Sequence, residues 1–335
     1  MIPPGPAGSN ATANGRLNLV ISRLMDAAIF GLLVADVIAR PINLSAPPRP
    51  GGLTHLSSIT LTGGGNACNV ATAMAKLGMS VAAAGLVGDD SLGRTIVERL
   101  REAGVNANSV ASDSRAQTSA TIVAVQGDGE RCFFHTPGVT ELIDASTFRA
   151  SFDLFRRAAW LQIGYFGLLP TLTGDLPDLL AELRQSAPGT RIALDTSDPP
   201  ADRRLLDPIL PHLDLFAPSR SEAALLTGET DPKRMVASFR NQMKTGIIGI
   251  KLDAHGCYLD DGENALGVAA DKVNVIDTTG AGDAWFAGLL CGLRKGMSLE
   301  ESGRLANRVG ADCCTALGAS AGVRNLEATL TSMKG

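Results

Sequence analysis

The chain has 335 residues, a formal net charge of −4, and a composition that is 45% hydrophobic, 19% charged and only 4% aromatic. Such a length can bury a large core, and the acidic balance without runs of Lys or Arg argues against nucleic acid as the main partner. The six cysteines form no C-x-x-C pair. We therefore expect buried, reduced thiols in a cytoplasmic protein, and neither a metal cluster nor a disulfide framework.

Residues 1–24 are predicted to be a disordered extension, because the chain begins with a stretch rich in Pro, Gly, Asn and Ala. The apolar segment that follows is interrupted by Arg23, Asp26 and Asp36. Its uncharged run is too short to cross a bilayer, so no membrane partner is expected. Residues 27–36 are instead predicted to be a buried strand, and we hypothesise that the extension is dispensable for folding.

The next elements alternate between β-rich excursions and a strand–helix core. Residues 37–62 are rich in Pro, Gly, Ser and Thr, which is typical of short edge strands or an irregular flap. A glycine turn then leads into a helix over 63–78, followed by a strand over 81–88 and an amphipathic helix that ends at Gly104. A second excursion, at about 117–136, contains two strands joined by "QGDGE", a strong hairpin signal.

From about residue 154 onward, strands alternate with helices. The predicted strands are "AAWLQIGY", "RIALDTS", "LDLFAPS" and "GIIGIKLD". This alternation predicts βαβ units and a mainly parallel, doubly wound sheet with helices on both faces. Residues 25–335 are thus predicted to form one α/β domain, with a small β-sheet lid built from the two excursions, 37–62 and 117–136.

The segment "DTTGAGDAWFAGLL" places a glycine turn and an aspartate at the start of a helix. Helix N-termini attract anions, and glycines at 280 and 282 let the N–H groups converge without Cβ obstruction. Asp283 beside them could take a proton from an attacking alcohol, which suits phosphoryl transfer to a hydroxyl. The alternative is an ordinary helix start with an early Asp. The chain contains no G-x-x-x-x-G-K-[ST] motif, which excludes an ordinary P-loop NTPase.

This segment resembles the C-terminal signature of the ribokinase-like, or PfkB, family of carbohydrate kinases. "GGNACNVATAMAKLG", residues 64–78, is similar to the N-terminal signature of the same family, and the two occur in the expected order. The resemblance extends from about Ala27 to near the end of the chain. It implies a ribokinase-like fold and ATP-dependent phosphorylation of a sugar hydroxyl with Mg²⁺, and it leaves activation by K⁺ open.

The resemblance also implies roles for individual residues at the reaction centre. Asp283 would be the catalytic base, and the backbone N–H groups of Gly280, Ala281 and Gly282 would form the anion hole. The residues implied to contact the sugar are Asp36, Gly64, Gly65 and Asn69. Asn69 as a helix-start residue and Asp36 as a solvated strand-end residue are the structural alternatives. His135 is a weaker candidate for a sugar contact.

A second set of residues would serve the nucleotide and Mg²⁺. Glu222 in "SRSEA" matches the glutamate of an N-x-x-E motif that organises Mg²⁺, often through water, whereas Ser219 stands where Asn is usual. A Ser-capped helix with an early Glu is the alternative. In "GIKLDAHGCYL", Lys251 and Asp253 replace the usual Thr and Gly, while Gly256 is retained.

Further residues match peripheral positions of the family's site. Asn307 matches a position near the adenine. Asp277, Thr279 and the Gly318–Ala319 turn match a monovalent-cation site. Asp195 and Asp198 are expected near the phosphates.

The implied acceptor is a free pentose, ketohexose or related sugar, and a homodimer through the lid is expected because lids of relatives often pair between subunits. Two alternatives remain open at this point. One is a nucleoside kinase, against which the scarcity of aromatic residues weighs. The other is a non-catalytic, sugar-binding regulatory protein on the same fold, which the departures at Ser219, Lys251 and Asp253 keep open.

Overall fold

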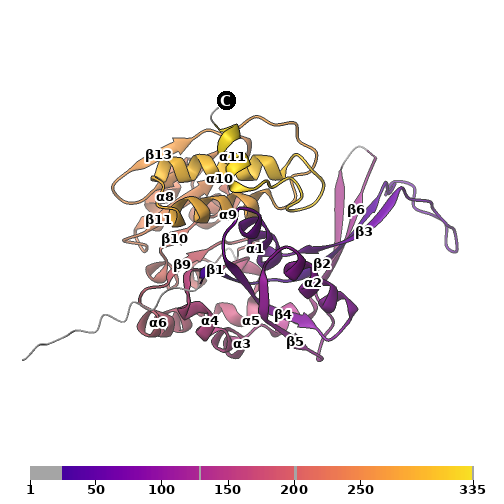
Figure 1. Cartoon of the computed structure of the whole chain (residues 1–335), viewed down its shortest axis with the longest axis horizontal. Helices are drawn as coiled ribbons and strands as arrows, with labels where there is room; N and C mark the ends of the chain where they lie inside the picture. The colour runs from indigo at the N-terminus through magenta and orange to yellow at the C-terminus, as the bar shows by residue number, and fades with distance from the viewer. Residues whose placement is uncertain (1–24, 128–129, 200–201, 334–335) are drawn as a thin grey trace, which may run out of the picture.

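The computed structural model describes residues 25–127, 130–199 and 202–333 of the chain. The predicted disordered extension, residues 1–24, lies outside the described residues. A large sheet flanked by helices forms the main body, and a small sheet stands at one side of it (Figure 1).

Within the described residues, nine strands form the large sheet. Their order across the sheet is β13 (Ala265–Val268), β12 (Cys257–Asp260), β11 (Ile247–Lys251), β10 (Leu215–Phe216), β9 (Arg191–Leu194), β8 (Ala158–Ile163), β1 (Met25–Phe30), β4 (Val81–Gly88) and β5 (Asn106–Asp113). The strands from β11 to β5 pair in parallel, and β12 and β13 continue the sheet in antiparallel pairs. Every residue of β4 and β8 is buried, as expected for strands covered on both faces.

Helices cover both faces of this sheet, each over its own apolar core. One face packs against α1 (Asn66–Lys76), α2 (Ser91–Glu102), α9 (Ala281–Arg294), α10 (Leu299–Cys313) and α11 (Leu326–Ser332). The other packs against α3 (Ala145–Ala150), α4 (Phe152–Arg156), α5 (Pro170–Thr173), α6 (Leu176–Ser186), α7 (Arg220–Thr227) and α8 (Pro232–Arg240). Short 3₁₀ helices complete the chain: η1 (Gly138–Leu142), η2 (Phe166–Leu168), η3 (Arg203–Leu205), η4 (Leu210–His212) and η5 (Asp253–His255).

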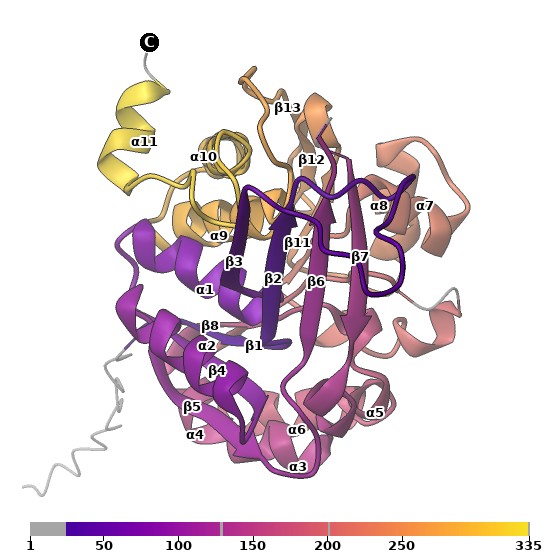
Figure 2. The ribbon, with the colours of Figure 1, turned by 90° about the vertical axis from the view of Figure 1, so that its right-hand side faces the viewer.

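The small sheet, called the lid sheet below, contains four strands of the described chain in the order β3 (Ser58–Gly64), β2 (Val34–Arg40), β6 (Ala120–Val125) and β7 (Arg131–Thr136). Strands β2 and β6 pair in parallel, and the other two pairs are antiparallel. The sheet joins two segments far apart in sequence, as Figure 2 shows. These strands lie within or close to the two predicted excursions, and β6 and β7 form the predicted hairpin.

The prediction of one continuous strand over residues 27–36 was wrong. The chain leaves the large sheet after Phe30, and β2 begins at Val34 in the lid sheet. The intervening turn is held in place because the Leu32 carbonyl accepts the Ala67 N–H, at 3.0 Å, from the first turn of α1. Asp36 therefore lies within a lid strand and not at the carboxyl end of a core strand. The turn escaped prediction because its residues are as apolar and buried as the strands that flank it.

Alternate residues of the lid strands face opposite sides of the sheet. The register aligns three rows on the inner face, namely Thr62–Asp36–Thr121–His135, Thr60–Ile38–Val123–Phe133 and Ser58–Arg40–Val125–Arg131. Since β2 leaves the main body at its first residue, the polar row lies nearest that point and the row with two arginines lies farthest from it. The outer face carries apolar residues that are exposed, Ile59 (70%), Ile122 (51%) and Phe134 (57%).

The two glycines that bracket α1 allow a test of why the turn before the helix needs glycine. Gly65 and Gly78 have nearly the same φ, 76° and 77°, but a Cβ at Gly65 would lie 2.5 Å from the Leu32 carbonyl oxygen, whereas none of the described atoms lies within 4 Å of one at Gly78. We expect Gly78→Ala to lower the free energy of unfolding by about 1–2 kcal/mol through φ alone. Gly65→Ala should lose a further 1–3 kcal/mol, roughly, through the clash. Urea unfolding of both variants checks this, and equal losses would contradict it.

Candidate active site

The predicted glycine turn forms the N-terminus of α9. Gly280 is the N-cap residue in a left-handed conformation, φ 74°, and a Cβ there would lie 2.5 Å from the Cβ of Ala319. Glycine is required at this position both by the conformation and by the close approach of the 318–319 turn. At Gly282 a Cβ would meet only the Lys251 ammonium, at 3.8 Å. The Ala281 N–H donates to the Thr278 carbonyl at 3.2 Å, so the anion-binding capacity of the turn lies mainly with its neighbours in the first turn of the helix.

Asp283 is buried in the first turn of α9, and three side chains donate hydrogen bonds to its carboxylate. Asn66 Nδ2 donates to Oδ1 at 3.1 Å, and Asn69 Nδ2 and the Tyr165 hydroxyl each donate to Oδ2 at 2.8 Å. Burial raises the pKa of Asp283, and the hydrogen bonds from Asn69 and Tyr165 offset this only in part. The carboxylate is thus fixed in position and made more basic.

Two of these three donors were missed by the sequence analysis. Asn66 stands three residues before Asn69, a spacing that puts both amides on the same face of α1, so the "NACN" spacing carried the signal. Tyr165 follows the carboxyl end of β8 with φ 55°, a strained conformation that a sequence does not reveal.

Three cavities meet around Asp283. The first, of about 1080 Å³, lies under the inner face of the lid sheet and is called the lid cavity; Tyr165 and Gly280 also line it. The second, the central cavity of about 230 Å³, is lined by Asp283 itself and shares Tyr165 and Gly280 with the first. The third, the outer cavity of about 680 Å³, shares Lys251 and Gly282 with the central cavity. Molecules in the lid and outer cavities would therefore meet at the glycine turn.

The predicted sugar contacts divide between the lid cavity and its supports. Asp36, Gly65 and Asn69 line the cavity. A Cβ at Gly64 would lie 2.0 Å from Asp36 Oδ2, so Gly64 makes room for that carboxylate. Burial raises the pKa of Asp36 to about 6, although a hydrogen bond from Thr121 lowers it.

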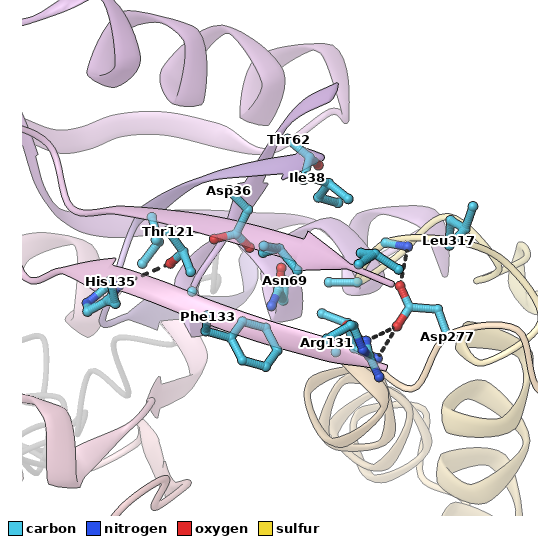
Figure 3. Close-up of a pocket in the computed structure, with 18 of the residues that line it drawn as sticks. Asp36, Ile38, Thr62, Asn69, Thr121, Arg131, Phe133, His135, Asp277 and Leu317 are labelled. Atoms are coloured by element: carbon cyan, nitrogen blue, oxygen red, sulfur yellow. Dashed lines mark hydrogen bonds and ion pairs between the residues drawn. The ribbon is translucent and has the colours of Figure 1, made fainter. Parts of the chain in front are cut away.

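The rest of the inner face offers further polar and apolar contacts to the lid cavity (Figure 3). His135 lines it and hydrogen-bonds to the Thr121 hydroxyl at 3.0 Å. Phe133, which the sequence analysis did not single out, presents its ring to the cavity from the middle row of the sheet.

A lysine–aspartate pair lies in the central cavity. Lys251 Nζ donates to Asp195 Oδ1 at 2.7 Å. Burial raises the pKa of Asp195 to about 6, even though Lys251 lowers it. The pKa of Lys251 is raised because Asp195 and Glu222 together outweigh the effect of its burial. The pair is thus charged at neutral pH and places a positive charge beside Gly282.

Ser219 and Glu222 form a capping box at the start of α7, so the structural alternative for them is observed. Ser219 Oγ accepts from the Glu222 N–H at 3.3 Å, and Glu222 Oε2 accepts from the Ser219 N–H at 2.7 Å. Glu222 also accepts from the Thr196 hydroxyl at 2.7 Å and the Ser197 N–H at 3.0 Å. Burial raises the pKa of Glu222, but Lys251 and these hydrogen bonds reverse the shift and keep it ionised. A carboxylate has about four lone-pair sites, so one remains for a water molecule.

Most of the predicted nucleotide residues line the outer cavity, namely Lys251, Asp253, Gly256, Gly282 and Asn307. Ser219 and Gly280 line the central cavity instead. Gly256 has φ 95°, and a Cβ there would lie 2.0 Å from the Val268 carbonyl oxygen. Asn307 accepts from Trp285 Nε1 at 2.9 Å and donates to the carbonyls of Val268 and Ala269 at 2.9 and 3.0 Å. Its amide therefore shapes the cavity wall by tying α9 and α10 to the chain after β13. Asp253 stands between the central and outer cavities.

The residues of the predicted monovalent-cation site do come together, but an arginine already serves the carboxylate. Asp277 Oδ1 accepts from the Thr279 N–H at 2.9 Å, and Oδ2 accepts from the Gly318 N–H at 2.9 Å. The Arg131 guanidinium, from the lid sheet, also donates to Oδ1 of Asp277 and to the Thr279 hydroxyl. Two unit charges about 5 Å apart repel by roughly 3 kcal/mol at an effective dielectric constant of 20. As arranged, these residues do not fit K⁺.

The described part of the chain contains no group of three or more His, Cys, Asp or Glu side chains placed to hold a metal ion. In the same residues, each helix is too short or too polar to cross a membrane.

Comparison with known proteins places the chain in a family. The sequence profile of the pfkB family carbohydrate kinases matches residues 25–326, and the chain belongs to this family. It is therefore a carbohydrate kinase, as the two signatures predicted, and the comparisons favour neither alternative.

Particular relatives agree with this assignment. The chain is 30% identical to fructokinase-2 of Oryza sativa subsp. japonica, over 93% of each chain. It is also 30% identical to an uncharacterized sugar kinase of Archaeoglobus fulgidus, over 75% of this chain and 97% of the relative. The structure of Arabidopsis thaliana ribokinase complexed with ribose and ATP superposes with a TM-score of 0.77 at 22% identity, covering 93% of this chain and 99% of that one. The predicted ribokinase-like fold is confirmed.

The buried pair in the central cavity leads to a stability prediction. Lys251→Met would leave the Asp195 carboxylate buried without its partner, which typically costs 3–5 kcal/mol, roughly. The double variant Asp195→Asn/Lys251→Met removes the uncompensated charge and should recover most of that loss. Urea unfolding at pH 7.5 measures both, and a double variant as unstable as Lys251→Met would refute the charge explanation.

Proposed function

We propose that this enzyme transfers the terminal phosphate of ATP to a hydroxyl of a free sugar, a pentose, ketohexose or related compound. The sugar lies in the lid cavity, the nucleotide in the outer cavity and the transferring phosphate in the central cavity. One observation carries the proposal: a buried carboxylate, Asp283, lines the central cavity beside the open helix N-terminus, and this cavity adjoins the other two. The fructokinase names of curated relatives, and the polar row of the lid sheet, support a polyhydroxylated acceptor.

In the proposed reaction, Asp283 accepts the proton of the attacking hydroxyl as that oxygen forms a bond to the terminal phosphorus. The bond from phosphorus to the bridging oxygen breaks, and ADP leaves. The raised pKa of Asp283 makes it a stronger base, and Asn66, Asn69 and Tyr165 hold it in place. The N-terminus of α9 and the Lys251 ammonium stabilise the charge on the phosphoryl oxygens.

Magnesium bound with the nucleotide would neutralise phosphate charge and help to place the terminal phosphate. Glu222 is the residue that would hold it, through water, because its carboxylate is ionised and keeps one lone pair unused. Ser219 acts through the cap that orients Glu222. We leave K⁺ out of the proposal, because the residues at Asp277 do not fit it.

We further propose that residues 25–335 work as one domain in the cytoplasm, with the lid sheet excluding water from the sugar. The six cysteines are free thiols, which suits a reducing compartment that also supplies ATP.

Asp283→Asn should lower kcat by about 10³-fold, within the range for loss of a general base, while ATP and sugar still bind. The melting temperature should not fall, because the substitution removes a negative charge that is buried away from water. Coupled ADP release with Mg-ATP, over a panel of pentoses, ketohexoses, aldonates and nucleosides, measures activity and specificity together. Asp312→Asn is the matched control: Asp312 is equally buried but pairs with Arg308 and Arg324 and lines none of the three cavities. It should lose stability and keep its turnover. Wild-type turnover in Asp283→Asn would refute the proposed base.

We also propose a homodimer formed through the outer face of the lid sheet, with a second copy of the chain covering Ile59, Ile122 and Phe134. The observation behind it is that one sheet has a polar cavity on one face and exposed apolar side chains on the other.

Ile122→Glu should therefore convert the dimer to a monomer, because it would bury a carboxylate in an apolar interface. Leu225→Glu, at an equally exposed leucine of α7 (55%), is the control and should leave the dimer intact. Sedimentation velocity at micromolar concentration measures both. A monomeric wild type, or a dimeric Ile122→Glu, would overturn the proposal.

A further inference from the structure

Arg131 joins the lid sheet to the loop that leads into the glycine turn. Its guanidinium donates to Asp277 (Figure 3). It also donates to Thr278 and Thr279, the next two residues of that loop. The side chain is 22% exposed and that of Asp277 only 9%. The sequence analysis did not single out Arg131, because its partners lie almost 150 residues further along the chain.

We propose that the Arg131 guanidinium is the built-in cation of the phosphoryl-transfer loop, in place of a monovalent metal ion, and that it thereby makes the geometry of the anion hole depend on the position of the lid. This inference rests on the proposed function, whose reaction the loop would serve.

The Asp277 carboxylate holds two segments of the chain together. One oxygen accepts from the Thr279 N–H and the other from the Gly318 N–H. The carboxylate thus ties the 277–279 loop to the 318–319 turn. Those two segments also meet at Gly280, where a Cβ would lie 2.5 Å from that of Ala319. The spacing of the two segments therefore sets where the first turn of α9 begins.

The Asp277 carboxylate places a negative charge in a largely buried position. A positive partner stabilises a buried carboxylate beyond what neutral donors supply. Burial raises the pKa of Asp277, but the N–H donors of Gly318 and Thr279, together with Arg131, lower it below its usual value. Two other cations belong to elements close to the 318–319 turn, Lys76 on α1 and Arg324 in the C-terminal segment. Lys76 donates to the carbonyls of Ser320 and Ala321, and Arg324 pairs with Asp312, so both are engaged elsewhere.

The cation that pairs with Asp277 comes from the lid sheet. Arg131 begins β7, in the inner-face row that lies farthest from the point where β2 leaves the large sheet. The contact between Arg131 and Asp277 therefore closes the lid cavity at the end opposite the one where β2 enters the lid sheet. If the lid moved away, the carboxylate would lose its only charged partner seen in the described structure. The negative charge of Asp277 in the 277–279 loop would then be neutralised by Arg131 only while the lid covers the sugar.

The test compares the cation dependence of wild type, Arg131→Ala and Arg131→Lys at constant ionic strength, with K⁺ exchanged for tetramethylammonium. Wild-type kcat should change less than about twofold. In tetramethylammonium, the kcat of Arg131→Ala should be about tenfold or more below that of the wild type, a loss of the size usual for coupling between two sites. K⁺ or free guanidinium should restore most of this kcat. Arg131→Lys should keep intermediate activity without K⁺ dependence. Strong activation of the wild type by K⁺, or an Arg131→Ala variant indifferent to cations, would overturn the proposal.

Thermal unfolding without substrates gives a readout that does not require catalysis. K⁺ should raise the melting temperature of Arg131→Ala and leave that of the wild type unchanged. Arg240→Ala is the matched control, since Arg240 and Asp260 form an ion pair of similar exposure, 21% and 20%, away from the three cavities. It should lose stability without gaining a response to K⁺. If the sugar panel shows no turnover, the proposed function fails, yet this measurement still decides the role of Arg131: no K⁺ response in Arg131→Ala refutes it.

Discussion

The burial of one carboxylate organises this molecule. Asp283 cannot remain charged in the interior without donors, and the protein supplies them from distant parts of the chain: two amides from α1 and a phenol from the end of β8. Satisfying Asp283 therefore fixes α1 against α9 and both against the carboxyl end of the parallel sheet. Burial away from water makes the charged form of Asp283 unfavourable and also raises its pKa. One physical cause therefore underlies both the loss of stability and the basicity proposed for this residue.

Around this point the site is built from pairs that balance charge locally. Lys251 faces Asp195, and Arg131 faces Asp277, on the two sides of the glycine turn. Each cation comes from an element other than the one that carries its partner. The turn is thereby held between the large sheet on one side and the lid sheet on the other. Phosphate binding at a helix N-terminus needs such a fixed frame, because backbone donors act only where they already point.

The sequence predicted what local signals encode. Alternating strands and helices indicated the parallel sheet, "QGDGE" indicated the hairpin, and the glycine turn with its aspartate indicated the candidate site where the cavities meet. Other features depend on tertiary contacts. The break after Phe30 is set by a hydrogen bond to α1, and its residues are as apolar as a strand. Tyr165 owes its role to a left-handed backbone at the end of β8. The helix cap at Ser219 was one of the two alternatives that the sequence offered, and the structure contains it. The "NACN" spacing contained a signal that was overlooked.

The lid sheet has a consequence that reaches beyond catalysis. Because its side chains alternate between faces, Thr121 and Val123 border the cavity while Ile122, between them, faces outward. Under the proposed function, neighbouring residues of one short strand therefore serve different purposes. A substitution at Thr121 or Val123 would alter the cavity, whereas one at Ile122 would alter the exposed outer face. An insertion of one residue in β6 would exchange the two faces at once, so the length of this strand is under tighter constraint than its composition.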